Sequence, residues 1–134
     1  MARSIDLLLR HRVTEDRLLA MLNDTIAEGV ESLDFPREGA AVFLLHVEHE
    51  AEFRQSVGLL WASDNLHLDE ISLAGRLAEA FETDVLWEPQ TLNLPNGYGW
   101  CLVTPDLQLH AVDTVDVDEG IALRHGAPRL PINR

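Results

Sequence analysis

The chain has 134 residues, of which 23 are acidic and 10 are arginine, with no lysine, so its formal net charge is −13. This balance argues against nucleic acid as a partner, because a phosphate backbone binds a basic surface, and the lack of lysine excludes Schiff-base catalysis and lysine-containing phosphate loops. The apolar share of 46% is enough for one hydrophobic core, and no apolar run reaches the roughly 18 residues that span a bilayer.

The N-terminal part of the chain predicts a strand followed by a helix. Ser4 to His11 alternates apolar and polar side chains as a half-buried strand does, although a helical start remains open. Thr14 is a suitable N-cap, and Glu15 and Asp16 suit the positive end of a helix in its first turn. Apolar residues then recur at helical spacing up to Gly29, where a helix ends readily.

The middle of the chain predicts two adjacent strands. After a loop at residues 35–39, Ala41–Val47 is a short run that is apolar on both faces, as in a central strand. Phe53 to Trp61 mostly alternates and predicts a further strand paired with it. The same residues also fit helical spacing, but Gly58 would weaken a helix interior by about 1 kcal/mol, which favours the strand.

The second half of the chain predicts a helix, a short strand and a hairpin. Asp69 is the expected N-cap of the helix. Its apolar stripe has four members: Ala74, Leu77, Ala78 and Phe81. Val85–Trp87 follows as a short strand and residues 89–97 as a loop. Residues 98–104 and 107–112 then predict two strands joined by a turn at Pro105-Asp106.

In chain order these elements are strand, helix, strand, strand, helix and strand, followed by a hairpin. The order predicts an α+β fold of the ferredoxin-like (βαββαβ) type, in which two helices cover one face of a mainly antiparallel sheet and a C-terminal β-hairpin extends it. We expect a single domain over residues 1–125 and a flexible tail over residues 126–134, which contain two prolines.

The six histidines do not predict a metal site. His46 and His49 are the closest pair in the sequence, but three positions apart on a strand they point to opposite faces. The remaining histidines are scattered along the sequence, whereas a zinc site needs three or four convergent ligands. We therefore expect no metal and no other cofactor.

No catalytic group is predicted either. Cys101 lies in an apolar, strand-like run without a helix N-terminus or base to lower its pKa, so we expect a buried apolar side chain. Asn96 to Gly99 contains two glycines but no nucleotide-binding pattern, which indicates a turn. Nothing selects a pair of acids for acid–base work, so we expect a protein that is not an enzyme.

The expected location is the cytoplasm. A single cysteine excludes an internal disulfide and fits a reducing compartment. Residues 1–12 contain charged residues amid short apolar runs and lack the uninterrupted apolar region of a signal peptide.

Acidic residues are concentrated in the second half of the chain. Residues 64–119 contain twelve acids and a single basic residue, Arg76. The densest cluster has four members: Asp113, Asp116, Asp118 and Glu119. Their spacing does not match a calcium loop, because the glycine and the terminal glutamate of such a loop are misplaced.

This acidic cluster has two interpretations. Because valines alternate with the acids, it fits an edge strand with its apolar side turned inward and its carboxylates in water. It also fits a row of carboxylates that binds the arginines and lysines of another protein. In the second case Trp87 and Tyr98 are candidate aromatic anchors of the neighbouring surface, as aromatic residues often are in interfaces.

A longer pattern runs through residues 69–106. From Asp69 to Leu86 the sequence is D-E-I-S-L-A-G-R-L-A-E-A-F-E-T-D-V-L, and after a loop it continues from Tyr98 to Asp106 as Y-G-W-C-L-V-T-P-D. This succession of an amphipathic helix, a short strand and an aromatic-led hairpin closing on Pro-Asp resembles the small acidic immunity proteins of bacterial polymorphic toxin systems.

The resemblance implies a small cytoplasmic protein that neutralises a cognate toxin by occluding its active site, and it transfers no individual functional residue. An acidic inhibitor suits a toxin with a basic site, because electrostatic steering raises association rates by roughly 10 to 1,000-fold. The alternative is a regulatory or small-ligand-binding domain with its ligand at a helix–strand junction.

Overall fold

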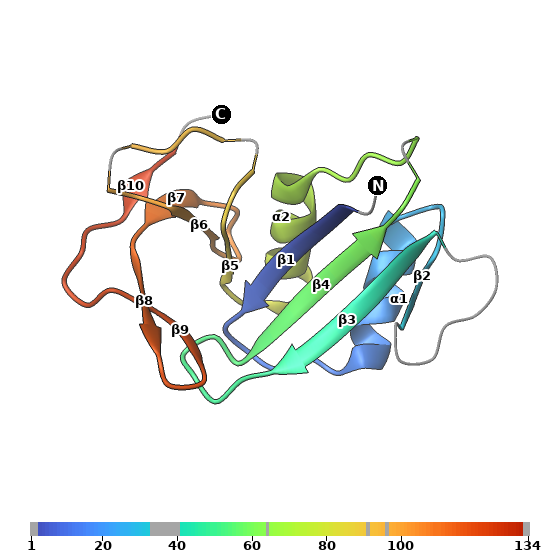
Figure 1. The fold of residues 1–134 in the computed structure, drawn as a ribbon, viewed down its shortest axis with the longest axis horizontal. Helices are drawn as coiled ribbons and strands as arrows, with labels where there is room; N and C mark the ends of the chain where they lie inside the picture. The colour runs from blue at the N-terminus through green and yellow to red at the C-terminus, as the bar shows by residue number, and fades with distance from the viewer. Residues whose placement is uncertain (1–2, 33–40, 64, 91, 96, 133–134) are drawn as a thin grey trace.

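The computed structural model describes residues 3–32, 41–63, 65–90, 92–95 and 97–132, so the loop expected at residues 35–39 lies outside the described part. Eight strands of the described chain form one sheet, which from edge to edge reads β10 (Leu130–Pro131), β7 (Leu109–Val112), β6 (Trp100–Val103), β5 (Val85–Trp87), β1 (Arg3–Leu9), β4 (Gln55–Trp61), β3 (Val42–Glu48) and β2 (Val30–Ser32). Neighbouring strands are antiparallel, except that β2 and β3 are parallel. β8 (Thr114–Val117) and β9 (Gly120–Leu123) form a separate hairpin (Figure 1).

The ferredoxin-like fold expected from the sequence is wrong, because the structure is mainly β. Residues 98–112 do form the expected hairpin of β6 and β7, but it is part of an eight-stranded sheet, in which Leu102 of β6 pairs with Leu86 of β5. β2 and β10 are additional strands, and their three and two residues are too few to produce an alternating pattern in the sequence. The sheet is therefore a mixed one of eight strands rather than a small antiparallel one.

The last described residues belong to this sheet, although we expected residues 126–134 to form a flexible tail. Leu130 in β10 pairs with Ala111 in β7, and the backbone N–H of Ile132 donates to the carbonyl oxygen of Leu109 at 2.9 Å. Pro131 is tolerated here because β10 is the outermost strand on its side of the described sheet and needs no second ladder.

Two helices, α1 (Glu15–Thr25) and α2 (Glu70–Phe81), confirm the predicted helices. The Thr14 side chain caps α1 by accepting a hydrogen bond from the backbone N–H of Arg17, as expected of an N-cap. The stripe of α2 is buried at Ala74, Leu77 and Ala78, whereas Phe81 is only half-buried. Neither helix of the described residues is long and apolar enough to cross a membrane.

The helices cover one face of the sheet and the β8–β9 hairpin covers part of the other. On β1, Ile5, Leu7 and Leu9 point toward the helices and belong to the main core. Leu8 points the opposite way and packs against a second buried cluster. That cluster has four members: Phe53, Leu86, Leu102 and Val112. Ile121 and Leu123 of β9 pack against it, so the hairpin supplies the third layer.

Three contacts hold the hairpin in place. The Glu52 carboxylate accepts a hydrogen bond from the backbone N–H of Leu123 at 2.9 Å. Arg124 forms an ion pair with Asp113, with 2.5 Å between Nε and Oδ2. Gly120 lies against the β3–β4 turn, where a β-carbon at position 120 would come within 2.7 Å of the β-carbon of Ala51. Figure 1 shows the hairpin beside that turn.

Candidate functional site

The hairpin leaves much of the second sheet face uncovered. In Figure 1, β1, β4 and β3 are seen on this side with the helices behind them. We call this surface the open face; its side chains include Asp6, Phe43, Leu45, Val47 and Leu60. Leu45 and Val47 are 38% and 40% exposed, which makes them two of the most exposed large apolar side chains among the described residues.

A row of cross-strand neighbours crosses the open face beside the end of the hairpin. Asp6 lies beside Gly58, and Gly58 lies beside Leu45, in the register of β1, β4 and β3. The β1–β5 ladder ends at Leu8 and Leu86, and beyond this end Asp6 and Glu88 line a common hollow. Trp100 of β6 lines the same hollow. Its cross-strand partner Val112 belongs to the second buried cluster, so Trp100 lies on the side of the sheet that the hairpin covers in part.

A pocket of about 310 Å³ occupies this row. We call it the Asp6 pocket; its lining includes Asp6, Glu88, Trp100 and Ile121. Ile121 comes from β9, so the edge of the hairpin forms one wall. With Leu8 and Gln90, which complete the lining, the pocket combines two carboxylates, an amide, an indole and two aliphatic side chains from four separate segments.

The two carboxylates of this pocket are not paired with an arginine of the described chain, whereas four other acids are. Arg10 pairs with Glu52 and Asp84, while other arginines pair with Glu50 and Asp113. Asp6 and Glu88 form no hydrogen bond or ion pair with another residue that the structure describes. Both carboxylates are exposed and therefore available to a cation that enters the pocket.

Gly58 leaves room for the carboxylate of Asp6, because it has no side chain on the open face. A β-carbon at position 58 would lie 2.9 Å from Oδ1 of Asp6 and 3.5 Å from the carbonyl oxygen of Leu45. The carboxylate of Asp6 therefore lies over the backbone of β4, in space that any larger residue would take. The glycine that argued against a helix in the sequence has a steric role in this strand.

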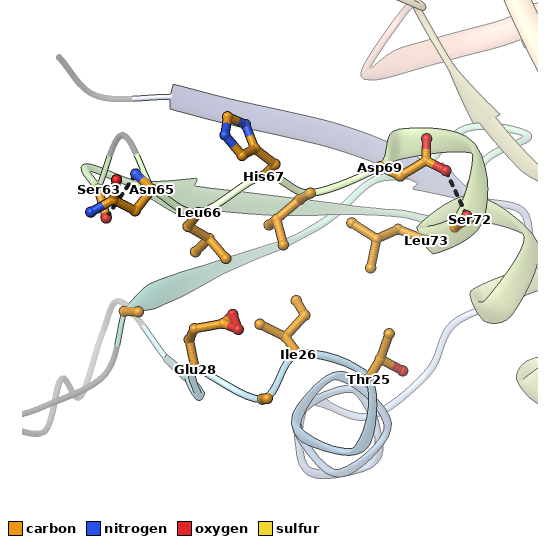
Figure 2. A pocket seen from close by; sticks show the side chains of 13 residues that line it. Thr25, Ile26, Glu28, Ser63, Asn65, Leu66, His67, Asp69, Ser72 and Leu73 are labelled. Carbon is orange, nitrogen blue, oxygen red and sulfur yellow. Dashed lines mark hydrogen bonds between the residues drawn. The ribbon is translucent and has the colours of Figure 1, made fainter.

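A second pocket, of about 690 Å³, lies between the end of α1 and the start of α2 (Figure 2). In Figure 2 the aliphatic side chains of Ile26, Leu66 and Leu73 point toward one another across it. Glu28 and Asp69 supply carboxylates at its rim, and Asp69 accepts a hydrogen bond from Oγ of Ser72 at 2.6 Å. These acids oppose an anion at the start of α2, so the pocket suits an apolar or neutral group.

The predicted acidic cluster is divided by the structure. Asp113 is half-buried and paired with Arg124, whereas Asp116, Asp118 and Glu119 are exposed. Asp118 and Glu119 are the two residues of the β8–β9 turn, and Glu119 adopts a left-handed conformation with φ 65°. These three acids form no hydrogen bond or ion pair within the described chain, so no arginine of the described residues neutralises their charge.

The edge-strand interpretation of this cluster needs a correction. β8 pairs with β9 and not with the main sheet. The side chains that the hairpin turns toward the sheet are Ile121 and Leu123 of β9, while Val117 of β8 is 41% exposed. Asp116 is the cross-strand partner of Ile121, so it lies next to a wall of the Asp6 pocket.

The two predicted aromatic anchors occupy different environments. Trp87 is 1% exposed and belongs to the main core, so its ring is not available on the surface. All three residues of β5 are buried, and Trp87 is one of them. Tyr98 is half-buried, and its hydroxyl donates to the carbonyl oxygen of Pro128 at 3.2 Å.

The two neighbouring histidines lie apart, as their spacing predicts. Nε2 of His46 lies 3.2 Å from Oε1 of the buried Gln55. Nε2 of His49 lies 3.2 Å from Oγ of Ser56, a residue on the opposite side of β4 from Gln55. Among the described residues no three histidine, cysteine or acidic side chains converge as metal ligands.

Cys101 is buried, as expected of an apolar side chain. Burial raises the pKa of its thiol to about 11, and the nearby Glu70 carboxylate contributes to the increase. A thiol with this pKa is almost fully protonated near pH 7 and is a poor nucleophile. Gly97 has φ 88°, which agrees with a turn before β6; Asn96 lies outside the described residues.

Asp6, Glu88 and Trp100 were not predicted as a site. The alternation of Ser4 to His11 already placed Asp6 and Leu8 on one face of a strand, opposite Ile5 and Leu7. What the sequence lacks is the sheet order, because only the pairing of β1 with β5 and of β5 with β6 brings the three residues together.

Comparison of the chain with protein-family models, with curated proteins and with solved structures finds no match. The function is therefore inferred from the chain's own side chains.

Proposed function

We propose that the chain is a non-catalytic binding protein that docks on a basic protein through the open face. The observation that carries this proposal is an uncovered sheet face with apolar side chains along β3 and unpaired carboxylates at its border. Apolar surface supplies binding energy of roughly 25 cal/mol per Å² removed from water, and the carboxylates select a partner of opposite charge.

The partner that best fits is a bacterial toxin with a basic active site, which makes the chain its immunity protein, acting in the cytoplasm. The formal charge of −13 supports this choice, since a protein so acidic is repelled by nucleic acid and attracted to enzymes that bind it. The resemblance of residues 69–106 to immunity proteins supports it independently of charge. In this proposal the chain blocks the toxin and carries out no reaction of its own.

Co-expression with the product of the neighbouring toxin gene tests the proposal. We expect the chain to restore growth of bacteria that produce the toxin, and the purified proteins to form a one-to-one complex in calorimetry. A Leu45→Asp, Val47→Asp variant should lose both effects while remaining folded, because these side chains are 38% and 40% exposed, and circular dichroism checks the fold. If the wild-type chain neither binds nor protects, the proposal is wrong.

The alternative is a small-ligand-binding or regulatory domain, and the pocket of Figure 2 is the observation that favours it. Its aliphatic walls and polar rim are usual for ligand sites, which bury apolar groups and orient them with few polar contacts. A compound screen by thermal shift distinguishes the two functions. A metabolite that raises the melting temperature of wild type, but not of a Leu66→Gln variant, would favour the ligand-binding function.

A further inference from the structure

We propose that the Asp6 pocket receives an arginine side chain of the partner protein. This inference rests on the proposed function for the identity of the partner, but the recognition chemistry follows from the pocket alone. Two carboxylates and an indole ring line one hollow of about 310 Å³, roughly ten times the volume of a liquid water molecule. The side chain that suits such a lining is cationic, planar and long.

The carboxylates determine the charge of the occupant. Asp6 and Glu88 both line the pocket, and both side chains are exposed. Neither has a partner among the described residues, so a cation that enters replaces no existing ion pair. A guanidinium group donates five hydrogen bonds in a fixed plane and can bridge both acids.

The indole ring of Trp100 favours arginine over other cations. Its ring lines the pocket beside Glu88, and a guanidinium group stacks on an indole face more favourably than a compact ammonium group. A calcium ion is less suitable, because it needs six to eight oxygen ligands and only two carboxylates line this pocket. Ile121 adds an aliphatic wall for the methylene stem of an arginine.

The position of the pocket ties it to the docking surface. Asp6 belongs to the row that contains Gly58 and Leu45, so the pocket opens onto the open face. A partner that covers Leu45 and Val47 can therefore place an arginine in the pocket without further movement of the sheet. Charged anchors surrounded by apolar contacts are a common arrangement at the centre of protein interfaces.

The direct test needs only the protein and a model of an arginine side chain. N-acetyl-arginine amide is titrated into the ¹⁵N-labelled chain, with the indole N–H signal of Trp100 identified by a Trp100→Phe variant. We expect a saturable shift of that signal with a Kd on the order of 1 mM, as for a ligand with so few atoms. N-acetyl-citrulline amide, which has nearly the same shape but no charge, should bind at least tenfold more weakly.

Two variants with the same change in charge complete the test. Asp6→Asn, Glu88→Gln should abolish the saturable shift, whereas Asp118→Asn, Glu119→Gln in the exposed β8–β9 turn should retain it to within about threefold, an effect of long-range charge alone. Circular dichroism and thermal melts establish that both variants fold. Equal binding of the citrulline compound, or equal losses in the two variants, would contradict the proposal.

A further arm separates a protein side chain from a free metabolite. Free L-arginine adds an ammonium and a carboxylate at its α-carbon, whose opposite charges largely cancel, so a pocket that recognises the side chain alone should bind the free amino acid no better than the capped amide. Tighter binding of the free amino acid would contradict docking of a protein side chain. Failure of the toxin experiment would overturn the proposed function, while the titration decides the chemistry of the pocket separately.

Discussion

Glu52 connects three parts of the fold through a single carboxylate. It forms an ion pair with Arg10, which follows β1, and it accepts the backbone N–H of Leu123 in β9. Burial would raise the pKa of Glu52, but the hydrogen bonds from Arg10 and Leu123 and the positive charges of Arg10 and Arg129 outweigh it and lower the pKa below 4.5. The ionised form therefore stabilises the folded state.

We expect Glu52→Gln to lower the free energy of unfolding by about 1 kcal/mol at pH 7, the usual contribution of such hydrogen bonds. Because the folded-state pKa is lowered, this contribution is complete above about pH 4.5 and is lost as the pH falls through the folded-state value. Denaturant melts of both proteins at pH 7 and pH 3 measure the difference, which should shrink at the lower pH. Glu50→Gln is the control: its pair with Arg12 is largely exposed, so the change should be small at both values.

Gly58 offers a second test at the scale of one residue. In Gly58→Ala the new methyl group would come within 2.9 Å of Oδ1 of Asp6, and the carboxylate can move aside because it ends a short side chain. The free energy of unfolding should therefore change by less than about 1 kcal/mol, whereas binding of N-acetyl-arginine amide should weaken severalfold. Thermal melts and the indole titration separate the two effects, and unchanged binding would show that Asp6 does not contact the ligand.

At the scale of elements, local pattern predicted β1 and β3 to β7 as strands, but neither the short strands β2 and β10 nor the assembly of the sheet. The helix at residues 15–25 follows from its capping residue and periodicity, and the helix at 70–81 and the strand at 55–61 follow from periodicity. Asp69 occupies the predicted N-cap position but its side chain caps no backbone N–H. The sheet order does not follow from local pattern, because β1 pairs with β4 and β5, which lie about 50 and 80 residues further along the chain. A period of two fixes the face of a side chain without fixing its neighbours.

The site shows the same division. The exposure of Asp116, Asp118 and Glu119 agrees with their prediction as outward-facing acids, while Trp87 was assigned to the surface and lies in the core. A tryptophan in a three-residue apolar strand is ambiguous, since a ring of this size can anchor an interface or fill a core. Only the pairing of β5 with strands on both sides decides in favour of the core.

The orientation of the β8–β9 hairpin can be tested by paired substitutions. Ile121→Ala, Leu123→Ala should destabilise the fold by about 1 to 3 kcal/mol, because both side chains pack against the second buried cluster. The matched change Val115→Ala, Val117→Ala should cost less than about 1 kcal/mol, since Val117 is 41% exposed. Denaturant melts measure both, and equal losses would show that the hairpin packs through β8.

At the scale of the whole molecule, charge should control the rate of binding more than its strength. With the toxin partner, raising the ionic strength from about 0.05 to 0.5 M should lower the association rate by about tenfold and change the dissociation rate much less. Asp116→Asn, Asp118→Asn should flatten this dependence, because both acids are exposed at the hairpin. Stopped-flow or surface kinetics at two salt concentrations measure it; a variant with unchanged rates would remove the hairpin from the approach of the partner.

The central place of β1 also affects the order of events during folding. β1 is the first strand of the chain, yet it lies between β4 and β5 and can complete neither ladder until residues 55–61 and 85–86 have been synthesised. Contacts between residues so far apart in the chain form slowly, because the entropy of closing the intervening loop is lost before the contact stabilises the chain. Refolding is therefore expected to take milliseconds to seconds rather than microseconds. Until β5 arrives, the edge of β1 that later pairs with it keeps unpaired backbone N–H and C=O groups, and such an edge in a nascent chain favours aggregation.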